Sequence, residues 1–134
     1  MKIVWTNGCF DILHVGHIEL FKYASSLGDA LIVGIDSDRK VAEAKGPARP
    51  FNSQTDRMKI LRAIKYIDDV IIFDSTEELS ETIRKVSPDI MVIGSDWEGK
   101  KVIGQEHTKE LKFFDRIDGY STTSIWKIEN DIRI

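Results

Sequence analysis

The sequence predicts an α/β fold in which a parallel sheet of about five strands lies between layers of helices. Short apolar segments alternate with longer segments of helical periodicity along the whole chain. Four of the short segments are apolar at consecutive positions and do not alternate with polar residues. This pattern is expected of strands that are covered on both faces of a sheet. Strands and helices that alternate in this way form parallel sheets joined by right-handed crossovers.

The chain begins with a predicted strand and helix. Residues 2–6 are apolar and rich in β-branched side chains, and the turn-forming pair Asn7 and Gly8 follows them. Residues 17–27 carry apolar side chains near helical spacing, and Gly28 is a helix stop signal.

The middle of the chain adds a strand and two helices. Residues 30–35 form the second apolar segment. Residues 36–49 are polar, with Gly46-Pro47 among them and Pro50 directly after Arg49. This pattern predicts a short helix followed by an exposed loop. Ser53 as N-cap and Asp56 in the first turn indicate the start of the next helix.

The rest of the chain continues the alternation. Residues 70–73 and 90–93 are the third and fourth predicted strands, and residues 77–86 are a helix between them. Residues 111–114 are a short fifth strand, and residues 121–129 are a terminal helix. The 134 residues contain no repeat or linker, so we predict one domain with a Rossmann-like three-layer sandwich.

Composition excludes several functional classes. Nineteen Lys and Arg against 22 Asp and Glu give a net charge of -3, which disfavours a nucleic-acid partner. The single cysteine excludes an intramolecular disulfide and a cysteine-rich zinc site, and no dedicated metal site is predicted. No apolar segment approaches the length of a membrane helix, so we expect no membrane insertion and a cytoplasmic location.

The turn after the first strand concentrates groups suited to phosphate. Gly8 lets the backbone approach a ligand closely, and a helix N-terminus follows with unpaired N–H groups. His14 and His17 stand beside that N-terminus and can hydrogen-bond phosphate oxygens. Taken singly, Gly8 is more often a turn glycine, and each histidine is more often a structural residue.

Together, these residues resemble a known family. Residues 8–17, GCFDILHVGH, match every fixed letter of the G-x-F-D-x-x-H-x-G-H motif of the cytidylyltransferase-like nucleotidyltransferases. Residues 116–123, RIDGYSTT, are similar to the family's R-T-E-G-I-S-T-T block and depart from it at three positions. The resemblance covers essentially the whole chain. It implies that an acceptor phosphate attacks the α-phosphorus of a nucleoside triphosphate and that pyrophosphate leaves.

Three segments bear on the substrates. Residues 94–100, GSDWEGK, and residues 62–71 resemble glycerol-3-phosphate cytidylyltransferases. This implies CTP and glycerol 3-phosphate as substrates and a CDP-activated precursor of a cell-wall or surface polymer as product. Residues 45–50, KGPARP, instead resemble adenylyltransferases that activate heptose 1-phosphate. The alternatives are therefore adenylyl transfer to a sugar 1-phosphate and, from another class, a nucleotide-binding module without turnover.

The resemblance also implies roles for individual residues. The catalytic set is His14, His17, Lys45 and Arg116. The nucleotide-binding set is Gly8, Cys9, Phe10, Asp11, Gly16, Asp96, Trp97, Gly119, Ser121 and Thr122. The acceptor-binding set is Lys40 and Arg57. Mg²⁺ bound mainly through the nucleotide phosphates and a homodimer are expected as well.

Several of these residues have a plainer interpretation. Asp11 either fixes its loop or is a solvated turn acid, and Arg57 is either an anion ligand or an exposed helix arginine. Trp97 is either a base or ribose contact or a core or dimer aromatic. Lys40 and Lys45 follow the second strand, and one of them reaches a phosphate unless both are solvated surface lysines. Because the net charge is negative, the cationic groups should converge at one edge of the protein.

Overall fold

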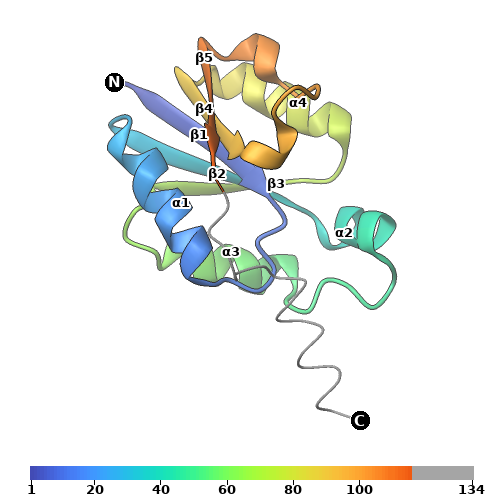
Figure 1. Ribbon diagram of the computed structural model, residues 1–134. Helices are drawn as coiled ribbons and strands as arrows, with labels where there is room; N and C mark the ends of the chain where they lie inside the picture. The colour runs from blue at the N-terminus through green and yellow to red at the C-terminus, as the bar shows by residue number, and fades with distance from the viewer. Residues whose placement is uncertain (116–134) are drawn as a thin grey trace.

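The computed structural model describes residues 1–115, and a five-stranded sheet forms its centre (Figure 1). The strands are β1 (Ile3–Gly8), β2 (Ala30–Asp36), β3 (Asp69–Phe73), β4 (Ile90–Gly94) and β5 (Glu110–Phe114). They lie in the order β3-β2-β1-β4-β5, and every neighbouring pair is parallel. The predicted parallel sheet, including its short fifth strand, is confirmed. The predicted helix 121–129 lies outside the described residues.

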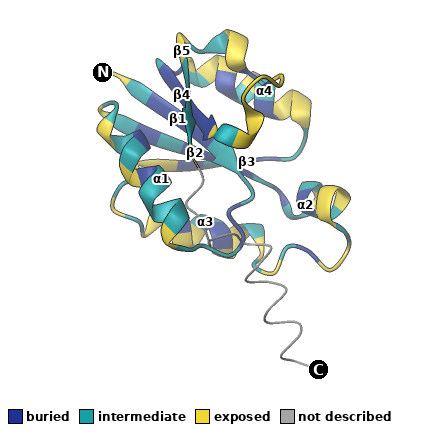
Figure 2. Cartoon of the chain, in the orientation of Figure 1, coloured by how far each residue is buried: buried dark blue, intermediate teal, exposed yellow. Residues whose placement is uncertain are grey.

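Helices cover both faces of this sheet. The helices are α1 (Val15–Ser26), α2 (Asp38–Lys45), α3 (Gln54–Arg62) and α4 (Thr76–Val86). On one face, Phe21 of α1 and Leu61 of α3 pack in one cluster with strand residues such as Val33. On the other face, Ile83 of α4 packs in a second cluster that includes Trp5. The buried strands and the exposed outer sides of the helices are visible in Figure 2, and the three-layer prediction is confirmed.

Three local features differ from the sequence-based expectation. Asn7 and Gly8 belong to β1 itself, because they pair with Gly34 and Ile35 of β2. Helix α1 begins at Val15 instead of residue 17, because His14 acts as its N-cap. The loop after α2 is not wholly exposed, since the side chain of Arg49 within it is buried.

The strand order places a crevice near the centre of the sheet. From β1 the chain first runs to β2 and β3 on one side, and later returns to β4 on the other side of β1. Ligands of open α/β sheets bind outside the carboxyl ends of the strands at such a reversal. The turn after β1 is therefore the expected position of the chemistry. Within residues 1–115, no helix has the length and apolar character needed to cross a membrane.

Candidate active site

The turn between β1 and α1 holds two histidines by reciprocal hydrogen bonds to the backbone. The Gly16 N–H donates to Nδ1 of His14 at 3.1 Å, and the His14 N–H donates to Nδ1 of His17 at 3.2 Å. This is the capping box of α1, with imidazoles where a hydroxyl and a carboxylate or amide are usual. A ring nitrogen that accepts a hydrogen bond carries no proton, so each neutral ring keeps its proton on Nε2. The backbone hydrogen bonds therefore fix both imidazole rings at a helix N-terminus.

Packing fixes the orientation of these rings. The rings of His14 and His17 stack with centroids 3.9 Å apart, and the ring of Phe10 meets His17 edge-on at 5.5 Å. Phe10 is buried and has a φ of 49°, a conformation that costs about 1–3 kcal/mol and is held only by its surroundings. A Cβ at Gly8 would lie 3.2 Å from the Phe10 ring. Gly8 therefore makes room for Phe10, in addition to any ligand.

The surroundings keep His17 neutral. Burial, the neighbouring His14 and the charge of Lys45 together lower the pKa of His17 from 6.5 to about 4. At pH 7 the His17 ring is therefore a hydrogen-bond donor through Nε2 and carries no charge. Burial raises the pKa of the Cys9 thiol, which makes that group a poor nucleophile.

The low pKa of His17 predicts a pH dependence of stability. Above pH 6.5 the ring is neutral in both the folded and unfolded states, and as the pH falls towards 4 only the unfolded state gains a proton. The free energy of unfolding should therefore drop by up to about 2 kcal/mol between pH 7.5 and pH 5. Urea unfolding of the wild type and of His17→Gln measures this drop. Gln suits this capping-box position and does not titrate, so the variant should lose less stability, and parallel pH profiles would contradict the prediction.

Asp11 fastens a second loop beneath this turn. Its buried carboxylate accepts hydrogen bonds from the N–H groups of Phe51 at 2.7 Å and Asn52 at 2.8 Å, and from Nε of Arg49 at 3.3 Å. Its carbonyl accepts from the Asn52 side chain at 2.8 Å. The solvated interpretation of Asp11 is wrong. The Asp11 carboxylate binds groups of this protein, and these contacts do not test a contact with a nucleotide. The predicted role of Asp11 in nucleotide binding therefore stays a prediction.

The two lysines of α2 serve different parts of the site. Lys45, at the exposed end of α2, lies within electrostatic range of both His17 and Cys9. The Nζ of Lys40 pairs with a carboxylate oxygen of Asp36 at 3.2 Å. The charge of Lys45 therefore acts on His17, whereas Lys40 is paired with Asp36.

Lys40 lines a hollow of about 330 Å³ at the carboxyl ends of the strands. Asn7 and Gly8 of β1, Asp36 at the end of β2, and Asp96 and Trp97 after β4 also line it. The side chain of Trp97 is 51% exposed, which excludes the core interpretation of this residue. The hollow brings predicted acceptor-binding and nucleotide-binding residues to one place.

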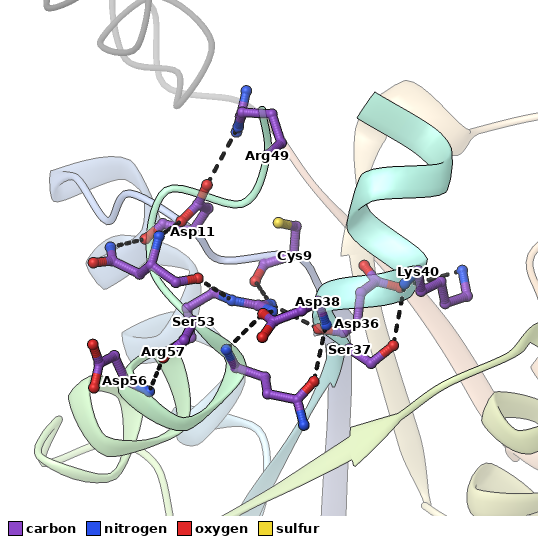
Figure 3. Close-up of polar contacts among 12 residues, drawn as sticks. Cys9, Asp11, Asp36, Ser37, Asp38, Lys40, Arg49, Ser53, Asp56 and Arg57 are labelled. Carbon is purple, nitrogen blue, oxygen red and sulfur yellow. Dashed lines mark hydrogen bonds and ion pairs between the residues drawn. The ribbon is translucent and has the colours of Figure 1, made fainter. Parts of the chain in front are cut away.

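Arg57 is placed differently from the other predicted site residues. It is fully buried, and its guanidinium donates to three backbone carbonyls and to Asp38 (Figure 3). The interpretation as an exposed helix arginine is therefore wrong. A direct contact between Arg57 and an acceptor would require this network to open.

Arg116, Gly119, Ser121 and Thr122 lie outside the described residues, and their predicted roles are untested. Within residues 1–115, no group of three or more His, Cys, Asp or Glu side chains could hold a metal ion. Mg²⁺ bound mainly through the nucleotide phosphates stays a prediction.

Sequence reasoning missed the residues that support the site. Arg49, Asn52, Asp38 and Gln54 bind Asp11, Arg57 or each other, and none was predicted to matter. The sequence carried only a weak indication that these residues support the site. Within residues 36–54, acidic, hydroxyl and amide side chains stand at the starts of two predicted helices, where they can cap a helix.

Comparison with known proteins gives consistent matches. A family model described as cytidylyltransferase-like matches residues 5–129. The bifunctional protein HldE of Campylobacter fetus is 50% identical over 123 residues, and that of Sulfurimonas denitrificans is 48% identical over 134 residues. These matches cover 92% and 99% of this chain but 27% and 28% of the relatives, so the chain spans little more than a quarter of their length.

A solved structure agrees with the sequence matches. The crystal structure of the lipopolysaccharide core biosynthesis protein from Thermoplasma volcanium superposes with a TM-score of 0.71 at 28% identity. The match covers 88% of this chain and 99% of that one.

Proposed function

The chain belongs to the cytidylyltransferase-like family, and from that premise we propose that it transfers an adenylyl group from ATP to a sugar 1-phosphate such as heptose 1-phosphate, releasing pyrophosphate. The observation that carries this proposal is the histidine pair that the capping box holds at the N-terminus of α1, with Nδ1 of each ring bound to the backbone. Such a site binds and stabilises phosphate oxygens and needs no side-chain nucleophile.

The proposed reaction requires the chain to position two anions. A phosphate oxygen of the acceptor attacks the α-phosphorus in line, the bond to the bridging oxygen breaks, and the electron pair leaves on pyrophosphate. His14 and His17 donate hydrogen bonds to the oxygens on which negative charge develops, and Lys45 reduces the repulsion between the two anions. Because His17 is neutral, it acts as a donor and not as a proton source.

Two findings favour ATP and a sugar 1-phosphate over CTP and glycerol 3-phosphate. The loop of residues 45–50 resembles heptose 1-phosphate adenylyltransferases, and the structure packs this loop against the histidine turn through Asp11. The relatives that match almost the whole chain bear the name HldE, and the matching solved structure is titled a lipopolysaccharide core biosynthesis protein. The Asp-Trp-Glu-Gly-Lys stretch, which suggested CTP, follows β4, and its Asp96 and Trp97 line the hollow, so it does not distinguish the two nucleotides.

Mg²⁺ and a homodimer stay predictions of the family resemblance. When bound to the triphosphate, Mg²⁺ would neutralise charge on its oxygens. The chain's own residues then bind the phosphates and exclude water around them.

Pyrophosphate release tests the proposal. The four nucleoside triphosphates are each combined with heptose 1-phosphate, other sugar 1-phosphates, glycerol 3-phosphate, phosphocholine and phosphoethanolamine. The expected result is turnover with ATP and a sugar 1-phosphate. Turnover with CTP and glycerol 3-phosphate alone would contradict it, and a nucleotide-induced thermal shift without turnover in any combination would favour the binding module.

A further inference from the structure

A buried guanidinium lies at the centre of the polar contacts beneath the site. Arg57 of α3 has no exposed surface, although a charged group is costly to remove from water. The chain compensates with four hydrogen bonds. Nε donates to the Asn52 carbonyl at 3.0 Å, Nη1 to the carbonyls of Cys9 at 3.0 Å and Asp36 at 2.7 Å, and Nη2 to Oδ1 of Asp38 at 2.9 Å.

These four acceptors come from three stretches of the chain that border the site, because Asp36 and Asp38 flank the junction of β2 and α2. Cys9 opens the turn that carries the histidines, and Asp36 ends β2. Asn52 belongs to the loop that Asp11 fastens, and Asp38 is the first residue of α2. One planar group therefore joins the histidine turn, the end of a neighbouring strand, the loop and the lysine-bearing helix (Figure 3).

Further contacts stiffen the same junction. The Asp38 N–H donates to Oε1 of Gln54 at 2.9 Å, and the Gln54 N–H donates to Oδ1 of Asp38 at 2.7 Å. This reciprocal pair ties the first turn of α2 to the first turn of α3. Because α2 is only eight residues long, fixing its start also fixes Lys45 at its other end.

We infer that Arg57 is a positioning residue that sets the placement of the histidine turn relative to α2, and so of the His14 and His17 donors relative to Lys45. This inference rests on the proposed function for its kinetic readout. Its geometric basis is the hydrogen bonding of one buried side chain to Cys9, Asp36, Asn52 and Asp38. Arg57 acts through the backbone and touches no substrate.

The chemistry of guanidinium explains why another cation would not serve. Arginine presents several N–H donors in one rigid plane, whereas a lysine ammonium is a compact charge on a flexible stem. Lysine at position 57 would keep a charge but could not bind four acceptors on three stretches of the chain. The histidine turn and α2 would then shift relative to each other, and a misplacement of about 1 Å can cost about a hundredfold in rate.

The kinetic test compares Arg57→Lys with Arg62→Met. Arg62 ends the same helix and is exposed, so its replacement controls for the loss of an arginine of α3 that lies outside the buried network. In Arg57→Lys we expect kcat to fall about 30–100-fold while KM for both substrates changes less than about threefold. Arg62→Met should retain wild-type kcat. A folded Arg57→Lys with kcat within threefold of the wild type, or with the whole loss in KM, would overturn the inference.

A second measurement does not depend on turnover. Amide chemical shifts of Arg57→Lys should move in residues 9–17 and 38–45 together, and those of Arg62→Met should not. Unchanged shifts in both segments would overturn the inference even in a protein without transferase activity. Shift changes in both segments of a protein without transferase activity would contradict the proposed function and still support the inference.

If Arg57→Lys does not fold, Asp38→Asn replaces it. This variant removes the negative charge from the acceptor that Nη2 shares with the Gln54 N–H, and it leaves the three carbonyl contacts. A smaller fall in kcat, about tenfold at unchanged KM, together with shift changes in residues 9–17, supports the inference. An unchanged kcat with unchanged shifts in residues 9–17 would overturn it.

Discussion

Replacement of His17 by alanine is expected to lower kcat for pyrophosphate release by about 10²–10³-fold or more, with the fold intact. The variant loses one of the two Nε2–H donors at the N-terminus of α1. Removal of a single preorganised donor to a developing oxyanion typically has an effect of this size. The loss should appear in kcat more than in KM, because the donor matters most where negative charge develops.

Steady-state kinetics with ATP and the best acceptor of the matrix measure this loss. The matched control is His107→Ala. His107 lies in the short helix η2 (Gln105–His107), which precedes β5 and lies outside the histidine turn. Its replacement should leave kcat within about twofold. Full activity of His17→Ala would refute the proposed role of the histidine pair.

Replacement of Asp11 by alanine is expected to reduce the free energy of unfolding by about 3–5 kcal/mol. The carboxylate is fully buried and ion-pairs with the buried Arg49 side chain at 3.3 Å. Removal of one partner of a buried ion pair is strongly destabilising. The N–H groups of Phe51 and Asn52 would lose their acceptor as well.

Urea unfolding at pH 7.5 measures the effect of Asp11→Ala. Asp56→Ala is the matched control, because Asp56 is an exposed carboxylate in the first turn of α3. Its loss should cost less than about 1 kcal/mol, the usual size of a helix-dipole interaction. Similar losses in the two variants would show that Asp11 does not fasten the loop.

The sheet could be predicted from sequence because its strands are apolar at consecutive positions. Residues 90–93, for example, are almost completely buried in β4, as their apolar character predicted. The position of the site followed from the histidine motif after the first strand. The start of α1 was misplaced by two residues because histidine is an unusual N-cap, and its capping hydrogen bonds are invisible in a hydrophobic pattern.

The supporting network could not be predicted because charged residues carry no local signal of burial. Arg57 and Asp11 contact residues 38 to 48 positions away in sequence, and helical spacing says nothing about such pairs. Lys40 and Lys45 are five residues apart in one helix, and only the fold shows that one pairs with Asp36 and the other approaches His17. Of the groups expected to converge, His14 and His17 stack on each other, Arg57 supports their turn from inside the protein, and Arg116 lies outside the described residues.

The fate of the phosphorus atoms of ATP tests the central claim most directly. The protein is incubated with heptose 1-phosphate and ATP labelled with ³²P at either the α or the γ position. We predict that the α label appears in a sugar nucleotide and the γ label in pyrophosphate, and that His17→Ala forms both products at least about 100-fold more slowly. A γ label on the sugar, or an α label that stays in ATP while CTP and glycerol 3-phosphate react, would contradict the account.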